Sequence, residues 1–333
     1  GMTANGAEGS TRAQMEQMMH TDTAVLNDYL KAYTDYMPNS EACQVNIANS
    51  IWFRDRDSLA INEDFLKTSR NYYDASIFEA PFDAGTRDDI NSWVKKETNG
   101  MIQKLLEEAP PRDAVMYLVN ALSFDGEWRD IYKKNQIHKG TFNAENGEHQ
   151  SAEFMYSTEA VYLENTLGRG FLKPYGDGAY AFAAVLPDEG MTMKEFLERL
   201  KENGITDLLE QTRNKTVCVR LPKFTVEYNV VLNESLTESG MKDAFDSQKA
   251  DFSSMAHSDN DNIYISKVIH KTKIDVDEKG TKAGAVTAVE VSEGSAVQTE
   301  EPKEVFLDRP FFYMIIDTRQ NFPLFMGCLM QLE

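Results

Sequence analysis

Histidine is the side chain most suited to acid–base chemistry near neutral pH, and this chain of 333 residues has only five. They are His20, His138, His149, His257 and His270. None stands in a metal-ligand spacing such as H-E-x-x-H. The sequence also has no G-x-S-x-G nucleophile motif and no glycine-rich phosphate loop. These residue types give little support to an enzyme, and we expect neither a metal site nor a cofactor.

Two acidic segments are the remaining candidates for chemistry. Residues 259–262 (DNDN) resemble the opening of a calcium-binding loop, but they lack its glycine and its terminal glutamate. Asp125 and Glu127, beside Trp128, could form a carboxylate pair, but nothing pairs them with a substrate pocket. We interpret the first segment as a polar surface turn and the second as the turn at the end of a strand.

The most informative segment is residues 277–291, DEKGTKAGAVTAVEV. It begins as a charged turn and continues with small and β-branched residues. At the two-residue period of a strand, one face is free of charge, whereas the other is mixed. The uncharged face carries Thr281, Ala283, Ala285, Thr287, Val289 and Val291. Because loops are usually polar, this pattern predicts a segment that is a loop in one state and an inserted strand in another.

Short motifs elsewhere in the chain point in the same direction. Residues 120–128 (NALSFDGEW) resemble a strand end, NA-x-x-F-x-G-x-W, and residues 221–224 are LPKF. The other matches are GMKDAF at 240–245, ADF at 250–252, VIHK at 268–271, INSW at 90–93, TNG at 98–100 and the C-terminal strands at 305–329. Taken in their order along the chain, these motifs resemble those of the serpins. Serpins are protease inhibitors that act by inserting their reactive loop into a sheet.

The resemblance implies the serpin fold over residues 1–333 as a single domain. This is an α+β fold with a large mixed or antiparallel central sheet, further sheets, about eight helices and a mobile reactive-centre loop, expected here at 278–304. The first residues resemble the second half of the family's helix B. We therefore expect the chain to be N-terminally truncated relative to the family.

The periodicity of the sequence agrees with an α+β fold. Helical periodicity is found at 23–36, 62–75, 86–108 and 193–211, with Asp88 expected near a helix start and Gly100 at a break. Residues typical of strands are found at 114–124, 179–186, 217–221, 264–277, 311–317 and 324–332. Helices come early and strands late, which argues against a repeating βαβ fold.

Composition limits the partners. The net charge of −20 argues against nucleic acid, anionic membranes and heparin. No apolar run is long enough to cross a bilayer. Three distant cysteines, Cys43, Cys218 and Cys328, fit free thiols better than a disulfide framework. We expect an extracellular or periplasmic location, because the proteases that such inhibitors meet are mostly extracellular.

The resemblance also implies roles for individual residues. The hinge of the loop would comprise Glu278, Gly280, Thr281, Ala283 and Ala285. By resemblance, His270 hydrogen-bonds Asn120 across the central sheet. Trp128 covers the end of the sheet where insertion begins, and Glu278 forms an ion pair with Lys223 at that point. Inhibition would then follow from cleavage of the loop and its insertion as a new strand.

The bond that a target protease cuts is expected between Val291 and Glu300. The spacing typical of the family gives Gly294–Ser295, and the other candidates are Val291, Val297 and Thr299. Residues 283–302 contain no Lys, Arg, Phe, Tyr, Trp or Leu, which disfavours trypsin-like and chymotrypsin-like proteases. We expect elastase-like or subtilisin-like serine proteases as targets, with glutamate-specific and papain-like cysteine proteases as alternatives.

Two alternatives to inhibition stay open. One is a non-inhibitory serpin that acts as a binding or storage protein. The other is a monomer that polymerises by donating its loop to a neighbour's sheet, which is a form of β-strand addition.

Overall fold

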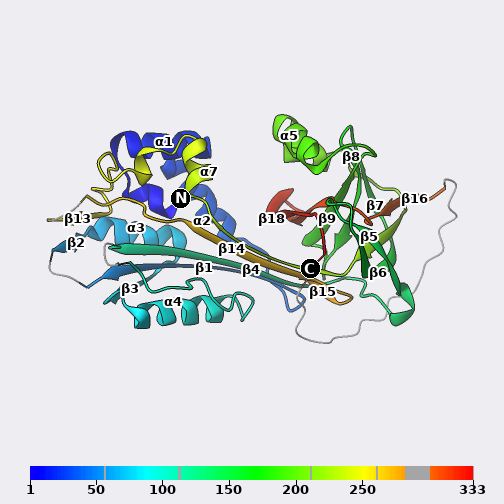
Figure 1. Cartoon of the computed structure of the whole chain (residues 1–333), viewed down its shortest axis with the longest axis horizontal. Helices are drawn as coiled ribbons and strands as arrows, with labels where there is room; N and C mark the ends of the chain where they lie inside the picture. The colour runs from blue at the N-terminus through cyan, green and yellow to red at the C-terminus, as the bar shows by residue number, and fades with distance from the viewer. Residues whose placement is uncertain (56–57, 112–113, 211, 260–261, 282–300, 333) are drawn as a thin grey trace. The chain divides into compact units, whose positions relative to one another are not determined.

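The computed structural model describes the whole chain except residues 56–57, 112–113, 211, 260–261, 282–300 and 333. Contacts group the chain into two units, each built from discontinuous segments (Figure 1). Unit 1 comprises Gly1–Pro38, Val45–Ser123 and Glu227–Lys273, and unit 2 comprises Asn39–Gln44, Phe124–Val226 and Ile274–Glu333. Both units mix helices and strands, and the single-domain organisation stays a prediction.

Unit 1 contains seven of the helices that the structure describes. They are η1 (Met2–Gly6), α1 (Gly9–Met19), α2 (Thr23–Asp35), α3 (Glu63–Tyr73), α4 (Ala84–Glu97), α7 (Asn233–Glu238) and η3 (Asp243–Phe245). Two of them, α3 and α4, begin at a side-chain cap. The N-cap of α4 is Asp83, which forms a capping box with Thr86. The prediction of Asp88 as the cap region was therefore wrong, whereas the helix predicted over 86–108 is confirmed as far as Glu97, shortly before the predicted break at Gly100. The helix ends at Glu97, and Asn99 and Gly100 follow with φ of 49° and 76°.

The helical segment predicted over 193–211 is two helices in unit 2. The helix α5 (Met193–Asn203) begins at Thr192, whose hydroxyl accepts from the backbone N–H of Glu195. Gly204 follows with φ 85° and separates α5 from α6 (Ile205–Glu210). Helical periodicity continues across this glycine, so the sequence pattern alone could not separate the two.

A six-stranded sheet has the order β12-β14-β15-β4-β1-β3. Its strands are β1 (Cys43–Arg54), β3 (Ser76–Ala80), β4 (Met116–Glu127), β12 (Phe224–Val231), β14 (Ile269–Val276) and β15 (Gly280–Thr281). The strands β4 and β14 correspond to the predictions for 114–124 and 264–277. Both begin later than predicted, and β4 also ends later, at Glu127.

Two clusters of buried side chains lie on opposite faces of β1 in unit 1. Ile51 packs in a cluster with Phe65 and Leu66 of α3. The next residue, Trp52, packs with Ile90 and Val94 of α4 in the other cluster. Because adjacent strand residues point to opposite faces, α3 covers one face and α4 the other (Figure 1).

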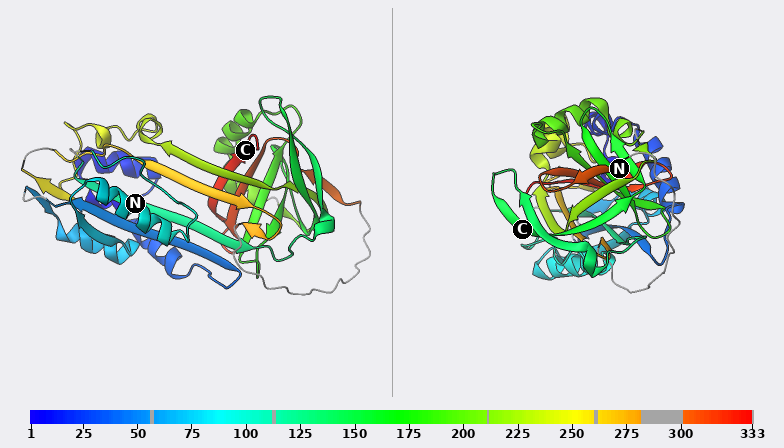
Figure 2. Two further views of the ribbon diagram at one scale, coloured as in Figure 1. Left: turned by 60° about the horizontal axis from the view of Figure 1, so that its bottom comes forward. Right: turned by 90° about the vertical axis from the view of Figure 1, so that its right-hand side faces the viewer.

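Unit 2 contains two further sheets. One has the order β10-β7-β8-β9-β17-β18, with β7 (Val161–Glu164), β8 (Gly168–Pro174), β9 (Tyr180–Pro187), β10 (Thr212–Arg213), β17 (Phe311–Asp317) and β18 (Phe322–Leu329). The other has the order β16-β11-β6-β5, with β5 (Ile137–Asn143), β6 (His149–Glu159), β11 (Val217–Pro222) and β16 (Lys303–Phe306). All eight residues of β9 are buried, which explains the continuous apolar run in its sequence. Figure 2 shows β17 beside β9 and β18, as their pairing requires.

The remaining elements are small. A two-stranded sheet joins β2 (Leu59–Ile61) and β13 (Ala256–Ser258), and η2 (Lys134–Gln136) precedes β5. The three cysteines are free, as expected, and burial raises the pKa of Cys43 to about 12 and that of Cys328 to about 11. In the part of the chain that the structure describes, no helix is long and apolar enough to span a membrane.

Candidate functional site

The hinge segment forms a tight turn between β14 and β15. The carboxylate of Asp277 accepts hydrogen bonds from the backbone N–H of Lys279 at 2.7 Å and of Gly280 at 3.1 Å. The backbone N–H of Asp277 donates to the carbonyl of Gly280 at 3.0 Å. An aspartate side chain that bonds the backbone two residues later is the mechanism of an Asx-turn. This turn returns the chain so that Thr281 pairs with Val276 of β14.

The other edge of β15 pairs with β4. Gly280 lies opposite Glu127, and Thr281 lies opposite Gly126, so β15 lies between β14 and β4. Gly280 is required by this close approach, because a Cβ there would meet the carbonyl oxygen of Gly126. The sequence-based expectation was that the chain from Gly280 onward enters the sheet once the loop is cut, but Gly280 and Thr281 already lie in the sheet of the uncleaved chain. The turn and the two edges place both residues there.

Three consecutive carbonyls of the turn accept hydrogen bonds from one short segment of unit 2. The indole Nε1–H of Trp128 donates to Asp277 at 2.8 Å. The backbone N–H of Trp128 donates to Lys279 at 2.7 Å, and the backbone N–H of Tyr132 donates to Glu278 at 2.9 Å. Trp128, which is 2% exposed, and Tyr132 therefore both hold the hinge turn, and the predicted role of Trp128 in insertion stays a prediction.

Thr281 is buried against an aromatic stack. Its hydroxyl lies 2.5 Å from the hydroxyl of Tyr175, and only 1% of the residue is exposed. Tyr175 stacks on Trp128 with ring centroids 4.4 Å apart and an interplanar angle of 11°. Burial raises the pKa of Tyr175 well above its ordinary value of 10.0. The phenol therefore keeps its proton and can donate to Thr281.

The predicted ion pair between Glu278 and Lys223 is present. The Lys223 ammonium lies 2.7 Å from Glu278 and 3.0 Å from Glu153. Burial lowers the pKa of Lys223, but the hydrogen bonds with the two carboxylates outweigh it, so the pKa is raised. The Lys223 hydrogen bond in turn lowers the pKa of Glu278. The lysine therefore connects the hinge turn to β6, which carries Glu153.

Comparison with known proteins agrees with this geometry. Residues 1–332 match the profile of the family described as "Serpin (serine protease inhibitor)". The chain belongs to the serpin family. An uncharacterised serpin-like protein of Methanosarcina mazei is 30% identical over 332 residues, which cover 97% of this chain and 76% of the relative. Leukocyte elastase inhibitor A of Rattus norvegicus is 28% identical over 340 residues, which cover 97% of this chain and 87% of that protein.

Solved serpin structures confirm the predicted fold. The native state of tengpin, a thermophilic serpin, is 44% identical and aligns with a TM-score of 0.91 over 99% of this chain and 85% of that one. A loop C-sheet serpin polymer is 40% identical, with a TM-score of 0.82 over 100% of this chain and 86% of that one. The α+β serpin fold is thus established for this chain.

Within unit 1, Asn120 has a different partner from the predicted one. Its side-chain amide donates to Oδ1 of Asn49 at 2.9 Å, and the Asn49 amide donates to the carbonyl of Tyr73 at 2.8 Å. His270 is exposed, and the hydrogen bonds found among the described residues include none between it and Asn120. The bond to Asn49 is favoured because β4 and β1 are neighbouring strands.

Several predicted residues of this serpin lie outside the described residues. These are Ala283 and Ala285 of the hinge and the cleavage candidates Val291, Gly294, Ser295, Val297 and Thr299. The expected loop 278–304 also overlaps two strands, because β15 ends at Thr281 and β16 begins at Lys303. For the intervening segment, the roles predicted from the sequence stay predictions.

The hinge residues that sequence reasoning missed come from distant segments. Tyr132, Tyr175 and Glu153 gave no local signal that would connect them to the turn. Lys173 did give one, because it is a charged residue directly after the apolar residues Phe171 and Leu172 of β8.

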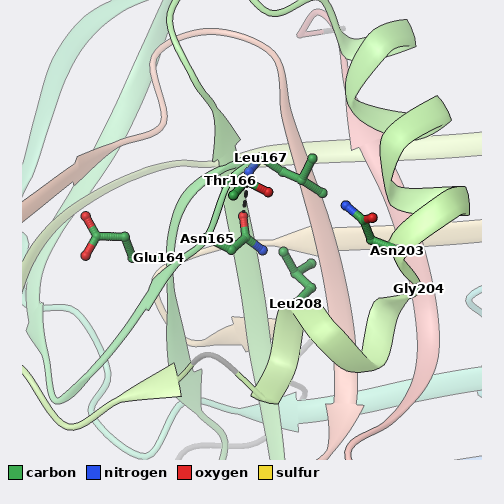
Figure 3. A pocket seen from close by; sticks show the side chains of 7 residues that line it. All are labelled: Glu164, Asn165, Thr166, Leu167, Asn203, Gly204 and Leu208. Atoms are coloured by element: carbon green, nitrogen blue, oxygen red, sulfur yellow. Dashed lines mark hydrogen bonds between the residues drawn. The ribbon is translucent and has the colours of Figure 1, made fainter.

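A separate pocket of unit 2 holds none of the hinge residues. It has a volume of about 200 Å³ and is lined by Glu164, Asn165, Thr166, Leu167, Asn203, Gly204 and Leu208 (Figure 3). The side chain of Asn165 accepts from the backbone N–H groups of Leu167 and Gly168, so it serves the turn between β7 and β8. In the described part of this serpin, no group of His, Cys, Asp and Glu side chains could hold a metal ion.

Proposed function

We propose that this serpin is a serine-type endopeptidase inhibitor that acts as a suicide substrate. The observation that carries the proposal is the position of Gly280 and Thr281 between β14 and β4. These two residues are the beginning of a further strand in the central sheet. The family description and the 28% identical leukocyte elastase inhibitor A support the same activity.

The proposed mechanism begins as ordinary proteolysis. The serine hydroxyl of the protease attacks the carbonyl of the cut bond, its proton passes to the leaving amine, and the C–N bond breaks. The N-terminal part of the loop is then an ester of the protease, and its tether to the rest of the loop is gone. Insertion continues from Thr281 and drags the protease along before water can hydrolyse the ester. The intact protein is therefore a kinetically trapped, metastable fold.

The residues that follow the hinge support the proposed targets. Elastase-like and subtilisin-like proteases accept small aliphatic residues, and residues 283–302 hold none of the basic or large aromatic residues that other classes prefer. The minor alternatives are glutamate-specific and papain-like cysteine proteases. An encounter with such targets fits the proposed extracellular or periplasmic location.

Mixing the protein with elastase and, separately, with subtilisin tests the proposal. We expect a band on a denaturing gel at the summed mass, because the ester survives denaturation. Mass spectrometry of the released C-terminal peptide then identifies the cut bond. Cleavage without a covalent band for any of the proposed protease classes would overturn the inhibitory function.

Replacement of Thr281 by Arg should convert the inhibitor into a substrate. Thr281 is 1% exposed, and burying an unpaired guanidinium there would cost several kcal/mol. We expect loop cleavage at an unchanged rate and the loss of nearly all covalent complex on the gel. Thr141→Arg, at an exposed position of β5, is the matched control and should trap protease like the wild type. Equal trapping by Thr281→Arg would exclude insertion as the mechanism.

A polymerising serpin is the second candidate function. The strand β16 is an edge strand that pairs in parallel with β11 over Val217–Arg220 only. A short edge strand can be replaced by a strand from another copy, and a related serpin forms a loop C-sheet polymer. Size-exclusion chromatography after mild warming distinguishes this function: oligomers that form without protease support it, and a stable monomer argues against it.

A further inference from the structure

Unit 2 contains a buried ion pair next to the residues that hold the hinge turn. The Lys173 ammonium on β8 is 2.8 Å from Oε1 of Glu159 on β6. Their side chains are 2% and 4% exposed, so solvent does not screen the pair. Ser157 also donates to Oε1 of Glu159, at 2.6 Å.

The remaining contacts of Lys173 converge on the segment that holds the hinge. Its ammonium lies 4.4 Å from the centroid of the Tyr132 ring and 5.4 Å from that of the Trp128 ring. It also donates to the carbonyl of Asp130 at 3.3 Å. A cation held this close to aromatic faces is attracted to them, most strongly where water is excluded. Three residues of the segment 128–132 are thus fixed by one ammonium group.

A second set of contacts closes the network. The hydroxyls of Tyr132 and Ser157 are 3.2 Å apart, and Ser157 in turn bonds Glu159. The Tyr132 ring is therefore held both by the cation and through the carboxylate partner of that cation. The same tyrosine donates its backbone N–H to the carbonyl of Glu278.

Stability alone does not account for this arrangement. Taking two charges out of water costs several kcal/mol for each ion, and replacing a buried pair by apolar residues is often neutral or stabilising. The two strands β6 and β8 could therefore be joined equally well by hydrophobic side chains. The specific gain from the pair is a fixed geometry for Trp128 and Tyr132.

We propose that Lys173, held by Glu159, is a positioning residue for loop insertion. It fixes Trp128 and Tyr132 so that their three N–H groups hold the carbonyls of residues 277–279, which keeps Gly280 and Thr281 in the sheet before cleavage. Insertion then starts from a preformed strand end and is faster than hydrolysis of the ester. This inference rests on the proposed inhibitory function and assigns a determinant of its efficiency.

The variant Lys173→Met tests the inference because methionine keeps the length of the apolar stem and removes the charge. We expect insertion to slow about fivefold, which corresponds to about 1 kcal/mol. More protease then escapes, so the number of inhibitor molecules consumed per trapped protease rises. Hydrogen exchange of the amides of Trp128, Tyr132 and Thr281 should accelerate by a similar factor in the uncleaved protein. Glu159→Gln, which keeps an acceptor for Lys173 and Ser157, should give a smaller change in the same direction.

A matched control removes another cation from a buried carboxylate of unit 2. Arg319→Gln deprives Asp317 of β17, which is 0% exposed, of its guanidinium partner at 3.2 Å. It should lower the unfolding temperature without changing the stoichiometry of inhibition or the exchange of the hinge amides. The inference would be overturned if Lys173→Met changed neither the stoichiometry of inhibition nor the hydrogen exchange of the hinge amides.

The exchange measurement separates the inference from the proposed function. Should the wild type form no covalent complex with any protease, the inhibitory function fails. Hinge amides that exchange faster in Lys173→Met, but not in Arg319→Gln, would still support the positioning role. Equal exchange in both variants would contradict it.

Discussion

Thr281 shows at the scale of single residues what the entry point of the sheet demands. The uncharged strand face in the sequence predicted a small buried residue here, and the structure confirms one that is 1% exposed. Its partner Tyr175 is 106 positions away along the chain, so no local pattern could connect the two. Sequence thus predicted the size and polarity of the hinge residue, whereas only the folded chain gives its hydrogen-bond partner.

The Glu278–Lys223 ion pair should contribute a pH-dependent part of the stability. The Lys223 hydrogen bond lowers the pKa of Glu278 below its ordinary value of 4.5. The contribution is therefore fully present above about pH 4.5 and is lost as the pH falls through the lowered pKa. Since the Glu278 side chain is 37% exposed, we expect at most about 1 kcal/mol.

Urea denaturation of the wild type and Glu278→Gln over pH 3–8 measures this contribution. The free energies of unfolding should differ by a constant amount at neutral pH and converge in acid. Glu234→Gln, which changes an exposed carboxylate in α7, controls for the change in net charge. A difference that persists unchanged to pH 3 would contradict an origin in the ionised pair.

The turn and strand around Gly280 show what periodicity cannot predict at the scale of elements. Periodicity predicted β17 (Phe311–Asp317) at its observed bounds, because an apolar run bounded by turn residues is a strong strand signal. Among the described residues, the strand β15 consists of Gly280 and Thr281, which pair with the two strands that flank them. The two-residue period that begins at Thr281 indicated a strand face, but only tertiary pairing shows that β14 and β4 are its neighbours.

Replacement of Gly280 by Ala should displace β15. A Cβ at this position would meet the Gly126 carbonyl and the Glu127 Cα, which are backbone atoms and cannot rotate away. Overpacking of this kind costs about 1–3 kcal/mol. We expect faster hydrogen exchange at the Thr281 amide and a lower unfolding temperature. Lys279→Ala, whose side chain is exposed in the same turn, should leave both unchanged; equal effects of the two variants would mean that close approach at Gly280 is not the cause.

The sequence predicted less about the arrangement of the whole molecule. Both units combine segments that are far apart along the chain, and the strand orders follow from those long-range pairings. Helical and strand periodicity gave the α+β class, but the serpin topology came from the resemblance of short motifs. Asn120 shows the limit of that resemblance, since it bonds Asn49 rather than the predicted histidine.

Loop cleavage should make the whole molecule more stable. In the proposed mechanism the cut loop extends β15 into a full strand, and each inserted residue adds hydrogen bonds worth about 1 kcal/mol. For roughly ten inserted residues and about 2–4 °C per kcal/mol, the unfolding temperature should rise by at least about 20 °C. Calorimetry of the intact and the loop-cleaved protein measures the change. Both scans use one rate, because unfolding of such proteins is often irreversible.

The control is Thr281→Arg cleaved at the same bond. This variant loses the tether but cannot insert, so its unfolding temperature should stay near that of uncleaved Thr281→Arg. A cleaved wild type that unfolds at the temperature of the intact protein would show that the strand begun at Gly280 and Thr281 does not extend, and would favour a non-inhibitory serpin.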